Sequence, residues 1–327
     1  MGVSALFASA IEGITRELGT VQWVVFDNGL GRRDKEFRTS DGSSLQLTHF
    51  GGRGGRRYYR PENLATMQFL SRLGPIGHLF NEGVRLIDSC DVILDVSGGD
   101  SFSDIYGWKR FRSVTSTKEI ALLRGKPLIL LPQTYGPYHD ERALKQAASI
   151  TRNAAMAWAR DPNSFEVLKR LLGPATNPAI HRQGVDMAFG LAPREALNRI
   201  PEKLAAWLSE SPRATPLVGI NINGLIYNDP ERARSHYRFV ADYRVVITGL
   251  VTRLLEMTAI RVVLIPHVMD EPGHYESDLD ACMNVADAIH EPLAQRLFVA
   301  PVDLDQSEVK WLISRMDWFC GTRLHST

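Results

Sequence analysis

The feature that most constrains this chain is the alternation of short apolar, β-rich runs with helical patterns along almost its whole length. The expected strands are Val21–Phe26, Leu45–Phe50, Val92–Val96, Leu128–Leu131, Met156–Ala159, Leu217–Ile222, Val262–Ile265, Leu297–Ala300 and Trp318–Cys320. The helical stretches between them are Leu64–Leu73, Lys118–Arg124, Glu141–Ala155, Ser164–Leu172, Val245–Thr258, Asp278–His290 and Ser307–Arg315. Strands that alternate with helices of this length predict βαβ units, and strands this apolar predict parallel sheets buried on both faces. We therefore expect an α/β fold with mainly parallel sheets.

A change in composition between Ala192 and Pro216 indicates a domain boundary. Four prolines and the polar stretch Ser209–Arg213 fall in this segment, just before a new strand. We predict an N-terminal α/β domain over residues 1–192, a linker over 193–215 and a C-terminal α/β domain over 216–327. A cleft between two such domains is a common place for a small-molecule site.

Both ends of the sequence depart from the usual course of an α/β domain. A helix is predicted from the first residues to about Leu18, and no strand precedes it. The last strand is followed by a turn that would open a helix, and the sequence stops there. We therefore expect the N-terminal domain to lack its first strand and the C-terminal domain to be truncated.

Composition excludes several classes of function. The net charge of +1 argues against general nucleic-acid binding, which needs a strong basic excess. Cys90, Cys282 and Cys320 are scattered and form no CxxC pair, so neither a disulfide framework nor a zinc site is expected. No carboxylate and histidine cluster has metal-ligand spacing, so no protein-bound metal is predicted. Scattered cysteines and the absence of a signal peptide or apolar span predict a cytoplasmic protein.

The motif that points most directly to a chemical function lies at the end of the sequence. The strand Trp318–Cys320 breaks at Gly321 and then presents Arg323 and His325. In open α/β sheets the carboxyl ends of the strands face the ligand crevice, so both side chains are expected there. Arginine suits bidentate capture of carboxylate or phosphate, and histidine can move a proton near neutral pH.

A second motif, Gly98-Gly99-Asp100, follows the strand Val92–Val96. Glycines at a strand end let a ligand approach the backbone, and their free amides can hold an anion. Asp100 would then stand at the crevice, where a carboxylate can take a proton from a sugar hydroxyl. A plain turn explains the same residues, and the spacing does not match a dinucleotide-binding fingerprint.

Polar residues also follow the next two strands. Gln133 and Tyr135 can hydrogen-bond a ligand, although the surrounding prolines and glycine fit a structural turn equally well. Arg160 points toward the same edge of the sheet. Asp186 either orients Arg160 or satisfies a loop.

In the C-terminal half, the strand ends offer amides and one histidine. Asn221 and Asn223 share one face of their strand, and Asn223 near its end is a candidate ligand contact. His267 is expected to be exposed at the end of the following strand. A single histidine in such a place is more often a structural hydrogen-bonding group than a catalytic one.

The stretch Phe50–Arg60 interleaves glycine, arginine and tyrosine. Such a tract is compatible with RNA binding, but it is short and the rest of the chain is neutral. A surface loop is the simpler interpretation. A third interpretation is that its arginines reach an anionic substrate.

Taken together, the motifs resemble those of the polysaccharide pyruvyl transferase family. The resemblance rests on the order and spacing of six segments over roughly residues 1–327: Ile93–Asp100, Pro127–Gly136, Ala159–Ser164, Val185–Phe189, Ile265–His267 and Gly321–Ser326.

The resemblance implies two Rossmann-like domains arranged as in GT-B glycosyltransferases. It also implies transfer of pyruvate from phosphoenolpyruvate to two hydroxyls of a sugar or lipid-linked glycan, which forms a cyclic ketal in polysaccharide, exopolysaccharide or cell-wall synthesis. Arg323 and His325 then hold the donor, with His325 as proton source, and Asp100 serves the acceptor side. Arg160, Asn223 and His267 are further donor-binding candidates, and Gly98, Gly99, Gln133 and Tyr135 are candidates for the acceptor or loop region. No covalently bound cofactor is implied, and a lipid-linked acceptor would bring the enzyme to the membrane periphery.

The sequence also departs from the family pattern. The usual opening strand with its acidic turn and the helix after His325 are absent. Asn221-Ile222-Asn223 stands where some relatives have a basic residue, which puts one donor-binding cation in question. Two alternatives therefore stay open: a nucleotide-sugar glycosyltransferase or epimerase of GT-B type, and a non-catalytic glycan-binding family member.

Overall fold

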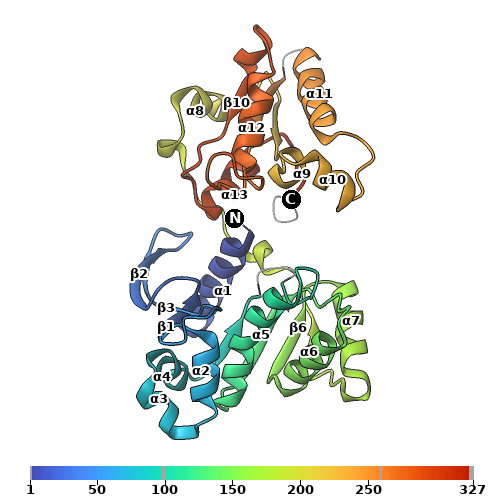
Figure 1. Ribbon diagram of the computed structural model, residues 1–327. Helices are drawn as coiled ribbons and strands as arrows, with labels where there is room; N and C mark the ends of the chain where they lie inside the picture. The colour runs from blue at the N-terminus through green and yellow to red at the C-terminus, as the bar shows by residue number, and fades with distance from the viewer. Residues whose placement is uncertain (1, 98–100, 258–259, 324–327) are drawn as a thin grey trace. The chain divides into compact units, whose positions relative to one another are not determined.

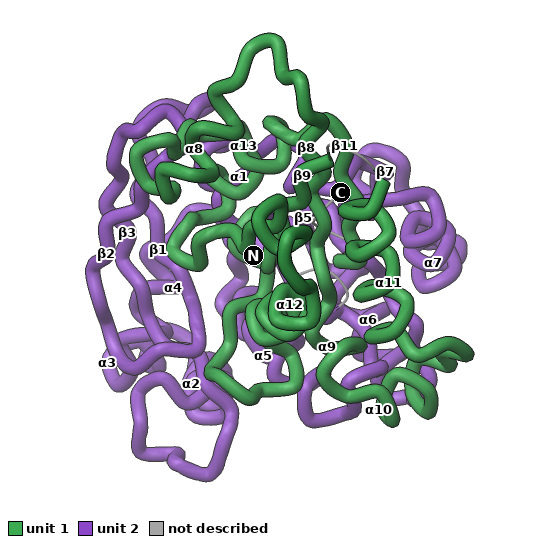
Figure 2. Tube along the Cα trace, turned by 90° about the horizontal axis from the view of Figure 1, so that it is seen from above, with its two compact units in different colours: residues 1–5, 192–327 green, residues 6–191 purple. Residues whose placement is uncertain are grey.

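The computed structural model describes residues 2–97, 101–257 and 260–323, and the chain divides into two compact units. Residues 6–191 form one unit, which we call the N-terminal unit. Residues 192–327 form the other, the C-terminal unit, together with residues 1–5 (Figure 2). Each unit is described by itself below.

The first helix, α1 (Gly2–Leu18), was predicted, and most of it, from Leu6 onward, belongs to the N-terminal unit (Figure 1). Its strands are β1 (Trp23–Asp27), β2 (Arg32–Arg38), β3 (Ser44–Gly51), β4 (Ile93–Asp95), β5 (Leu128–Gln133), β6 (Met156–Ala159) and β7 (His181–Gln183). Its other helices are α2 (Leu64–Ser71), α3 (Gly77–Phe80), α4 (Glu82–Ser89), α5 (Trp108–Leu123), α6 (Glu141–Asn153) and α7 (Pro162–Leu172), with short 3₁₀ turns η1 (Gly74–Ile76), η2 (Gly173–Ala175) and η3 (Met187–Gly190).

The described strands of this unit form two sheets. One has the order β1-β3-β2, in which β1 pairs in parallel with β3 and β2 pairs antiparallel with it. The other has the order β4-β5-β6-β7 and is parallel throughout. The carboxyl ends of the parallel strands are the places where the sequence puts most of the candidate site residues.

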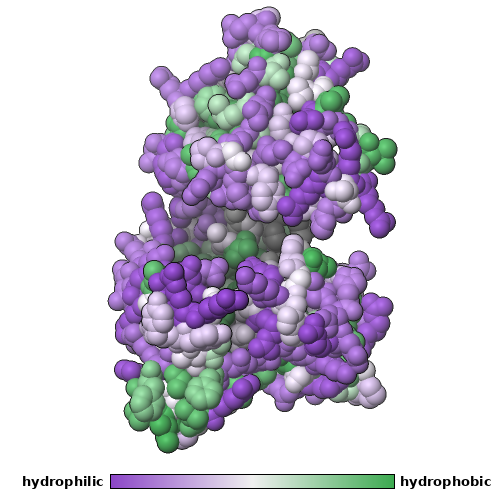
Figure 3. Space-filling model, in the orientation of Figure 1, coloured by the Kyte–Doolittle hydropathy of each residue, from purple (hydrophilic) through white to green (hydrophobic). Residues whose placement is uncertain are grey.

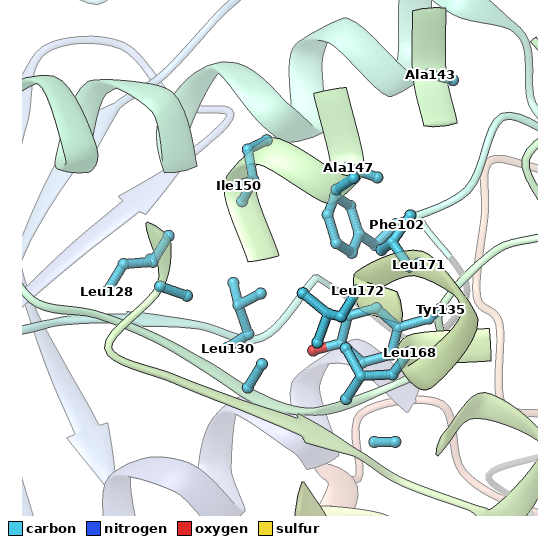
Figure 4. Close-up of a cluster of buried hydrophobic side chains, with 14 of the residues drawn as sticks. Phe102, Leu128, Leu130, Tyr135, Ala143, Ala147, Ile150, Leu168, Leu171 and Leu172 are labelled. Atoms are coloured by element: carbon cyan, nitrogen blue, oxygen red, sulfur yellow. The ribbon is translucent and has the colours of Figure 1, made fainter. Parts of the chain in front are cut away.

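The core of the N-terminal unit is packed around β5 and β6 by α5, α6 and α7 (Figure 4). At its centre Phe102 stacks on Phe111 with ring centroids 6.3 Å apart and meets the ring of Tyr135 edge-on at 5.7 Å. Small residues such as Ala143 and Ala147 let α6 approach the sheet closely. A second cluster joins Phe50 at the end of β3 to helices α2, α4 and α5. Burial of these side chains at about 25 cal/mol per Å² holds the strand ends in place.

The C-terminal unit contains one sheet among its described residues, with the order β10-β9-β8-β11 and parallel pairing throughout. Its strands are β8 (Leu217–Ile220), β9 (Arg261–Leu264), β10 (Leu297–Val299) and β11 (Trp318–Cys320). Its helices are α8 (Glu202–Ser209), α9 (Gly224–Tyr227), α10 (Pro230–Ser235), α11 (Tyr243–Glu256), α12 (Asp278–Asp287) and α13 (Gln306–Ser314), with 3₁₀ turns η4 (Leu197–Arg199) and η5 (Leu293–Arg296).

Strand β9 shows why this sheet is apolar on both faces. Val262 and Leu264 pack toward α11 and α12, whereas Val263 packs on the opposite face with α8 and α13. Successive residues of a strand point to opposite faces, so a sheet covered by helices on both sides needs a continuous apolar run. The α/β class with mainly parallel sheets is thus confirmed.

The segment 193–215, expected to be a linker, contains helix α8. Leu204, Trp207 and Leu208 of this helix are buried in the core of the C-terminal unit. The apolar residues of α8 are flanked by prolines and polar residues, so the sequence pattern did not indicate a buried helix. The interpretation of this segment as a linker was therefore wrong.

Two strands were not predicted. Strand β2 reads Arg-Arg-Asp-Lys-Glu-Phe-Arg and is mostly exposed, so it has no apolar alternation to reveal it. It forms because its backbone pairs with β3 from Arg32 opposite Phe50 to Arg38 opposite Ser44. Strand β7 is only three residues long. The predicted strands are confirmed with end shifts of up to two residues.

One part of the surface is strongly apolar. Large hydrophobic side chains gather over α2, η1 and α3, at the lower left of Figure 3. These are Phe69, Leu73, Ile76, Leu79 and Phe80, all exposed. We call this the α2–α3 patch. None of the described helices combines the length and apolar composition that a membrane span requires.

Candidate functional site

An ion pair with a buried lysine holds the end of strand β4. Lys118, only 1% exposed, places its ammonium 2.9 Å from Oδ1 of Asp95, the last residue of β4. The same ammonium donates to Oγ of Ser97 at 2.6 Å and to the Val114 carbonyl at 3.1 Å. It also lies 5.0 Å from the centre of the Phe102 ring. A buried cation with this many partners is fixed in one position.

Ser97 completes the network. Its hydroxyl donates to Oδ2 of Asp95 at 2.7 Å, and its φ of +41° is in the left-handed region that non-glycine residues rarely occupy. Such a conformation persists only when the surroundings impose it, as Asp95 and Lys118 do here. The network therefore fixes the backbone conformation of Ser97. Gly98, Gly99 and Asp100 themselves lie outside the described residues.

Lys118 is a residue that sequence reasoning missed. It lies in α5 at the spacing of the buried face, three residues after Thr115 and seven after Phe111. A lysine in phase with a buried stripe was the available signal.

Gln133 and Tyr135 lie at the end of β5 and are both buried. The amide atoms of Gln133 and the hydroxyl of Tyr135 make no normal hydrogen bond within the described part of the chain. Burial raises the pKa of Tyr135 well above its usual value, with contributions from Tyr138 and the charge of Asp95, while a contact with Gln133 acts in the opposite direction. Buried polar atoms without partners are rare, so these groups are suited to a bound molecule.

Arg160, at the end of β6, is engaged by Asp186. Its Nη1 donates to Oδ2 of Asp186 at 3.0 Å, and Oδ1 of Asp186 accepts the amide of Ala188 at 2.9 Å. The sequence left two roles open for Asp186, and the structure shows both. It orients Arg160 and caps the 3₁₀ turn η3.

The same strand ends border a pocket of about 370 Å³, within the usual range of small-molecule sites. One wall comes from α1, and the other comes from the residues at the ends of β5, β6 and β7. The lining residues are Ser9, Gly13, Arg16, Pro132, Trp158, Gly184, Val185, Asp186, Met187 and Gly190. The carboxylate of Asp186, which pairs with Arg160, therefore borders a cavity large enough for part of a sugar.

In the C-terminal unit, the candidate residues gather around Asp278, which is fully buried. Its carboxylate accepts the amides of Gly224 at 2.7 Å, His267 at 3.2 Å and Val268 at 3.1 Å. These amides follow β8 and β9. One buried carboxylate therefore joins the loops at the carboxyl ends of two strands.

Arg323, after β11, binds the same carboxylate. Its Nη2 donates to Oδ1 of Asp278 at 2.6 Å and to the Glu276 carbonyl at 3.2 Å, and its Nε lies 3.2 Å from Oδ1. The cation predicted at this strand end is thus held by a charge-assisted pair at the sheet edge. His325 lies outside the described residues.

The two asparagines have structural roles in this edge. Asn221 donates to the Ile265 carbonyl at 3.0 Å and accepts the amide of Arg323 at 3.1 Å, which ties β8 to the loops after β9 and β11. Asn223 caps α9 by accepting the amide of Leu225 at 3.1 Å.

His267 was expected to be exposed, and this was wrong. Only 5% of its surface is exposed, because the Asp278 carboxylate draws its backbone into the packed edge of the sheet.

No group of three or more histidine, cysteine, aspartate or glutamate side chains suited to a metal ion occurs among the described residues.

Comparison with known protein families shows which family the chain belongs to. The family model for polysaccharide pyruvyl transferase matches residues 27–327, nearly the whole chain and every strand-end motif described above. The chain belongs to the polysaccharide pyruvyl transferase family. It is therefore a transferase of polysaccharide biosynthesis, and the family supports pyruvyl transfer to a glycan in general.

Comparisons with curated proteins and with solved structures give less information about function. No curated protein matches the sequence. Among solved structures, the chain is similar to one described as the OtsA apo structure, with 13% identity and a TM-score of 0.48, covering 96% of this chain and 74% of that chain. It is also similar to an alpha,alpha-trehalose-phosphate synthase (UDP-forming) from Burkholderia vietnamiensis, with 8% identity, a TM-score of 0.42 and the same coverages of 96% and 74%.

Proposed function

We propose that this family member transfers pyruvate from phosphoenolpyruvate to two hydroxyls of a sugar in a polysaccharide or glycan precursor, forming a cyclic ketal and releasing phosphate. Family membership supports the reaction class. The observation in the structure that supports it best is the Lys118–Asp95–Ser97 network, which fixes the backbone at Ser97, three residues before Asp100 in the sequence.

In this proposal the donor methylene accepts a proton from His325, which leaves a cationic centre at C2. The first sugar hydroxyl attacks C2 and gives its proton to Asp100. Phosphate then leaves with the C2–O bonding electrons, and the second hydroxyl closes the ketal and loses its own proton. Each acid–base role is typically worth about 10²–10⁴ in rate.

Cations must hold the phosphate and carboxylate of the donor. We assign Arg323 to this role, with Arg160 as a further cation. Asn223 and His267 are candidates for additional hydrogen bonds to the donor. The negative charge of Asp278 weakens the attraction of Arg323 for an anionic donor. The same contact fixes the orientation of the guanidinium, which favours a defined geometry for the bound donor.

The direct test is incubation with phosphoenolpyruvate and a panel of free and lipid-linked glycans, read by mass spectrometry for the pyruvyl adduct and by phosphate release. His325→Ala and Asp100→Asn should lower turnover by about 10²–10⁴ without loss of the fold. His290→Ala and Asp287→Asn change exposed residues of the same types and should keep wild-type turnover. Near-normal phosphate release by either site variant would refute its assigned role.

Two rival functions have different signatures. A nucleotide-sugar enzyme would be stabilised against heating by a nucleotide-sugar and not by phosphoenolpyruvate. A non-catalytic glycan-binding member would bind phosphoenolpyruvate or glycan without releasing phosphate.

A further inference from the structure

The loop between β3 and α2 forms a small basic pocket that the proposed mechanism does not use. Its volume is about 250 Å³. Its lining residues are Arg53, Gly54, Gly55, Arg56, Arg57, Arg60, Glu62 and Asn63. Sites for whole small molecules usually measure about 300–1,000 Å³, so this pocket is the size of a subsite for one group.

The backbone of this loop is held in place. Arg53 donates its amide to the Glu62 carbonyl at 2.8 Å and accepts the amide of Leu64 at 2.9 Å. The side-chain amide of Asn63 donates to the Gly55 carbonyl at 3.0 Å, and the Thr66 hydroxyl donates to the Tyr58 carbonyl at 2.7 Å. Asn63 also caps α2, so the loop is fastened to a helix. The pocket is therefore built by ordered backbone.

Its positive charges are not neutralised. Arg60 lies 3.7 Å from Glu62, whose side chain is almost buried. Arg53, Arg56 and Arg57 are exposed, and no carboxylate of the described chain pairs with them. Four guanidiniums against one carboxylate leave an excess of like charge in a small volume, which is unfavourable until an anion enters.

Two further observations point to a glycan-bearing ligand. Tyr58 and Tyr59, on the same loop, are 60% and 82% exposed, and exposed tyrosine rings offer rigid amphipathic contact area. The loop also follows Gly51, at the carboxyl end of β3, and Gly52 donates to the carbonyl of Asp27 at the end of β1. Carboxyl ends of strands are where α/β sheets bind ligands.

We propose that this arginine pocket is an acceptor subsite that binds a phosphate or diphosphate group attached to the acceptor glycan. The inference rests on the proposed function, because it assigns the N-terminal unit, with Asp100, to the acceptor. Guanidinium forks match phosphoryl oxygens by bidentate hydrogen bonds, which gives both affinity and orientation. The subsite would hold the acceptor by its anionic group while the sugar hydroxyls react elsewhere.

The first experiment measures binding without turnover. Inorganic pyrophosphate is titrated calorimetrically into wild type, the Arg56→Ala/Arg57→Ala variant and the Arg72→Ala/Arg85→Ala variant. The last pair also removes two exposed arginines of the same unit, but outside the pocket. We expect the dissociation constant to rise at least tenfold in the pocket variant, about 1.4 kcal/mol, and to change less than twofold in the control. Equal affinity in wild type and the pocket variant, or equal weakening by both pairs, would overturn the proposal.

The second experiment uses matched acceptors, a phosphorylated glycan and its dephosphorylated form. In Arg56→Ala/Arg57→Ala, KM for the phosphorylated acceptor should rise at least tenfold, with kcat, KM for phosphoenolpyruvate and KM for the neutral acceptor unchanged. Free and diphosphate-lipid-linked acceptors distinguish the two sources of the phosphoryl group. A rise in KM for phosphoenolpyruvate instead would make the pocket a donor site, and tighter binding of oligo(U) RNA than of pyrophosphate would make it an RNA site. Either result contradicts the proposal. If no pyruvyl transfer is found, the calorimetric titration still decides whether the pocket binds phosphoryl groups.

Discussion

At the scale of single residues, both units pair a carboxylate with a cation where strands end, and one member of each pair, Lys118 or Asp278, is buried. In the N-terminal unit Asp95 pairs with Lys118, and in the C-terminal unit Asp278 pairs with Arg323. Removing one member of such a pair leaves an uncompensated buried charge, which is far costlier than losing the attraction itself. The pairs therefore act as fixed supports for the turns that follow.

Lys118 offers a direct test of this idea. Lys118→Met should lower the free energy of unfolding by about 3–5 kcal/mol, because it leaves the Asp95 carboxylate, only 14% exposed, without its cation. Adding Asp95→Asn should recover part of that loss, since the unpaired charge is then removed. Chemical denaturation of the two single variants and the double variant measures the coupling. Strictly additive losses would mean that the two side chains do not support each other.

Turnover separates a positioning role from a merely stabilising one. If the double variant regains stability, its phosphate release should nevertheless stay low, because Ser97 has lost the Lys118 ammonium and keeps only a neutral amide at position 95 to hold its left-handed backbone. Wild-type kcat in a restabilised double variant would show that the network only stabilises the fold.

Candidate residues of the sites could be predicted from the sequence only in part. Glycine and polar residues after apolar strands pointed to Arg160, Asp186 and Arg323, and the structure places each of them just after a strand of its own sheet. Their roles in a site stay predictions. Lys118 was missed because helical position alone does not reveal a partner on a distant strand. His267 was misplaced because its burial depends on Asp278, eleven residues later in the chain.

At the scale of elements, helix α8 shows what local sequence conceals. Leu204 is completely buried between α8 and the sheet of the C-terminal unit. Leu204→Ala should therefore cost about 2–5 kcal/mol of unfolding free energy, as in a packed core. A substitution in a true linker would cost less than about 0.5 kcal/mol. Glu202→Ala, two residues earlier on the exposed side of α8, is the control for both values.

Helix α13 begins with a capping box, in which Asp305 accepts the amide of Glu308 and Glu308 accepts the amide of Asp305. Burial raises the pKa of Glu308, but the Asp305 amide and the Arg199 guanidinium, with the charges of Arg199 and Arg194, outweigh it and lower the pKa overall. A lowered folded-state pKa means stabilisation that is present above the unfolded value of about 4.5 and lost as pH falls through the folded value.

Glu308→Gln removes this titration. The variant should be less stable than wild type at pH 7. The difference should shrink as pH falls below the unfolded-state pKa of about 4.5 and through the lower pKa of the folded state, where Glu308 becomes protonated. Urea unfolding across that range measures it. A difference that stays constant with pH would show that the carboxylate charge contributes nothing. Glu202→Gln, at an exposed helix start, is the comparison for a solvated carboxylate.

At the scale of the whole molecule, net charge and the α2–α3 patch act together. The calculated isoelectric point is about 7.8, so charge repulsion between molecules vanishes there. Exposed apolar patches then favour self-association. Light scattering should therefore show most association near pH 7.8 and less at either side. Leu79→Ser/Phe80→Ser should reduce association at pH 7.8 with little change in unfolding free energy, whereas unchanged scattering would exclude the patch as the cause.

The sequence by itself determined the α/β class, most strands and helices, and the family. Those properties follow from local hydrophobic periodicity and from short motifs at strand ends. Both can be recognised from residues that are close together in the sequence. Only the tertiary structure decided that Lys118 supports Asp95, that Asp278 gathers the loops after β8, β9 and β11, and that residues 53–63 form an arginine pocket. These depend on contacts between residues far apart in the chain, and such contacts arise only when apolar burial brings the helices and strands together.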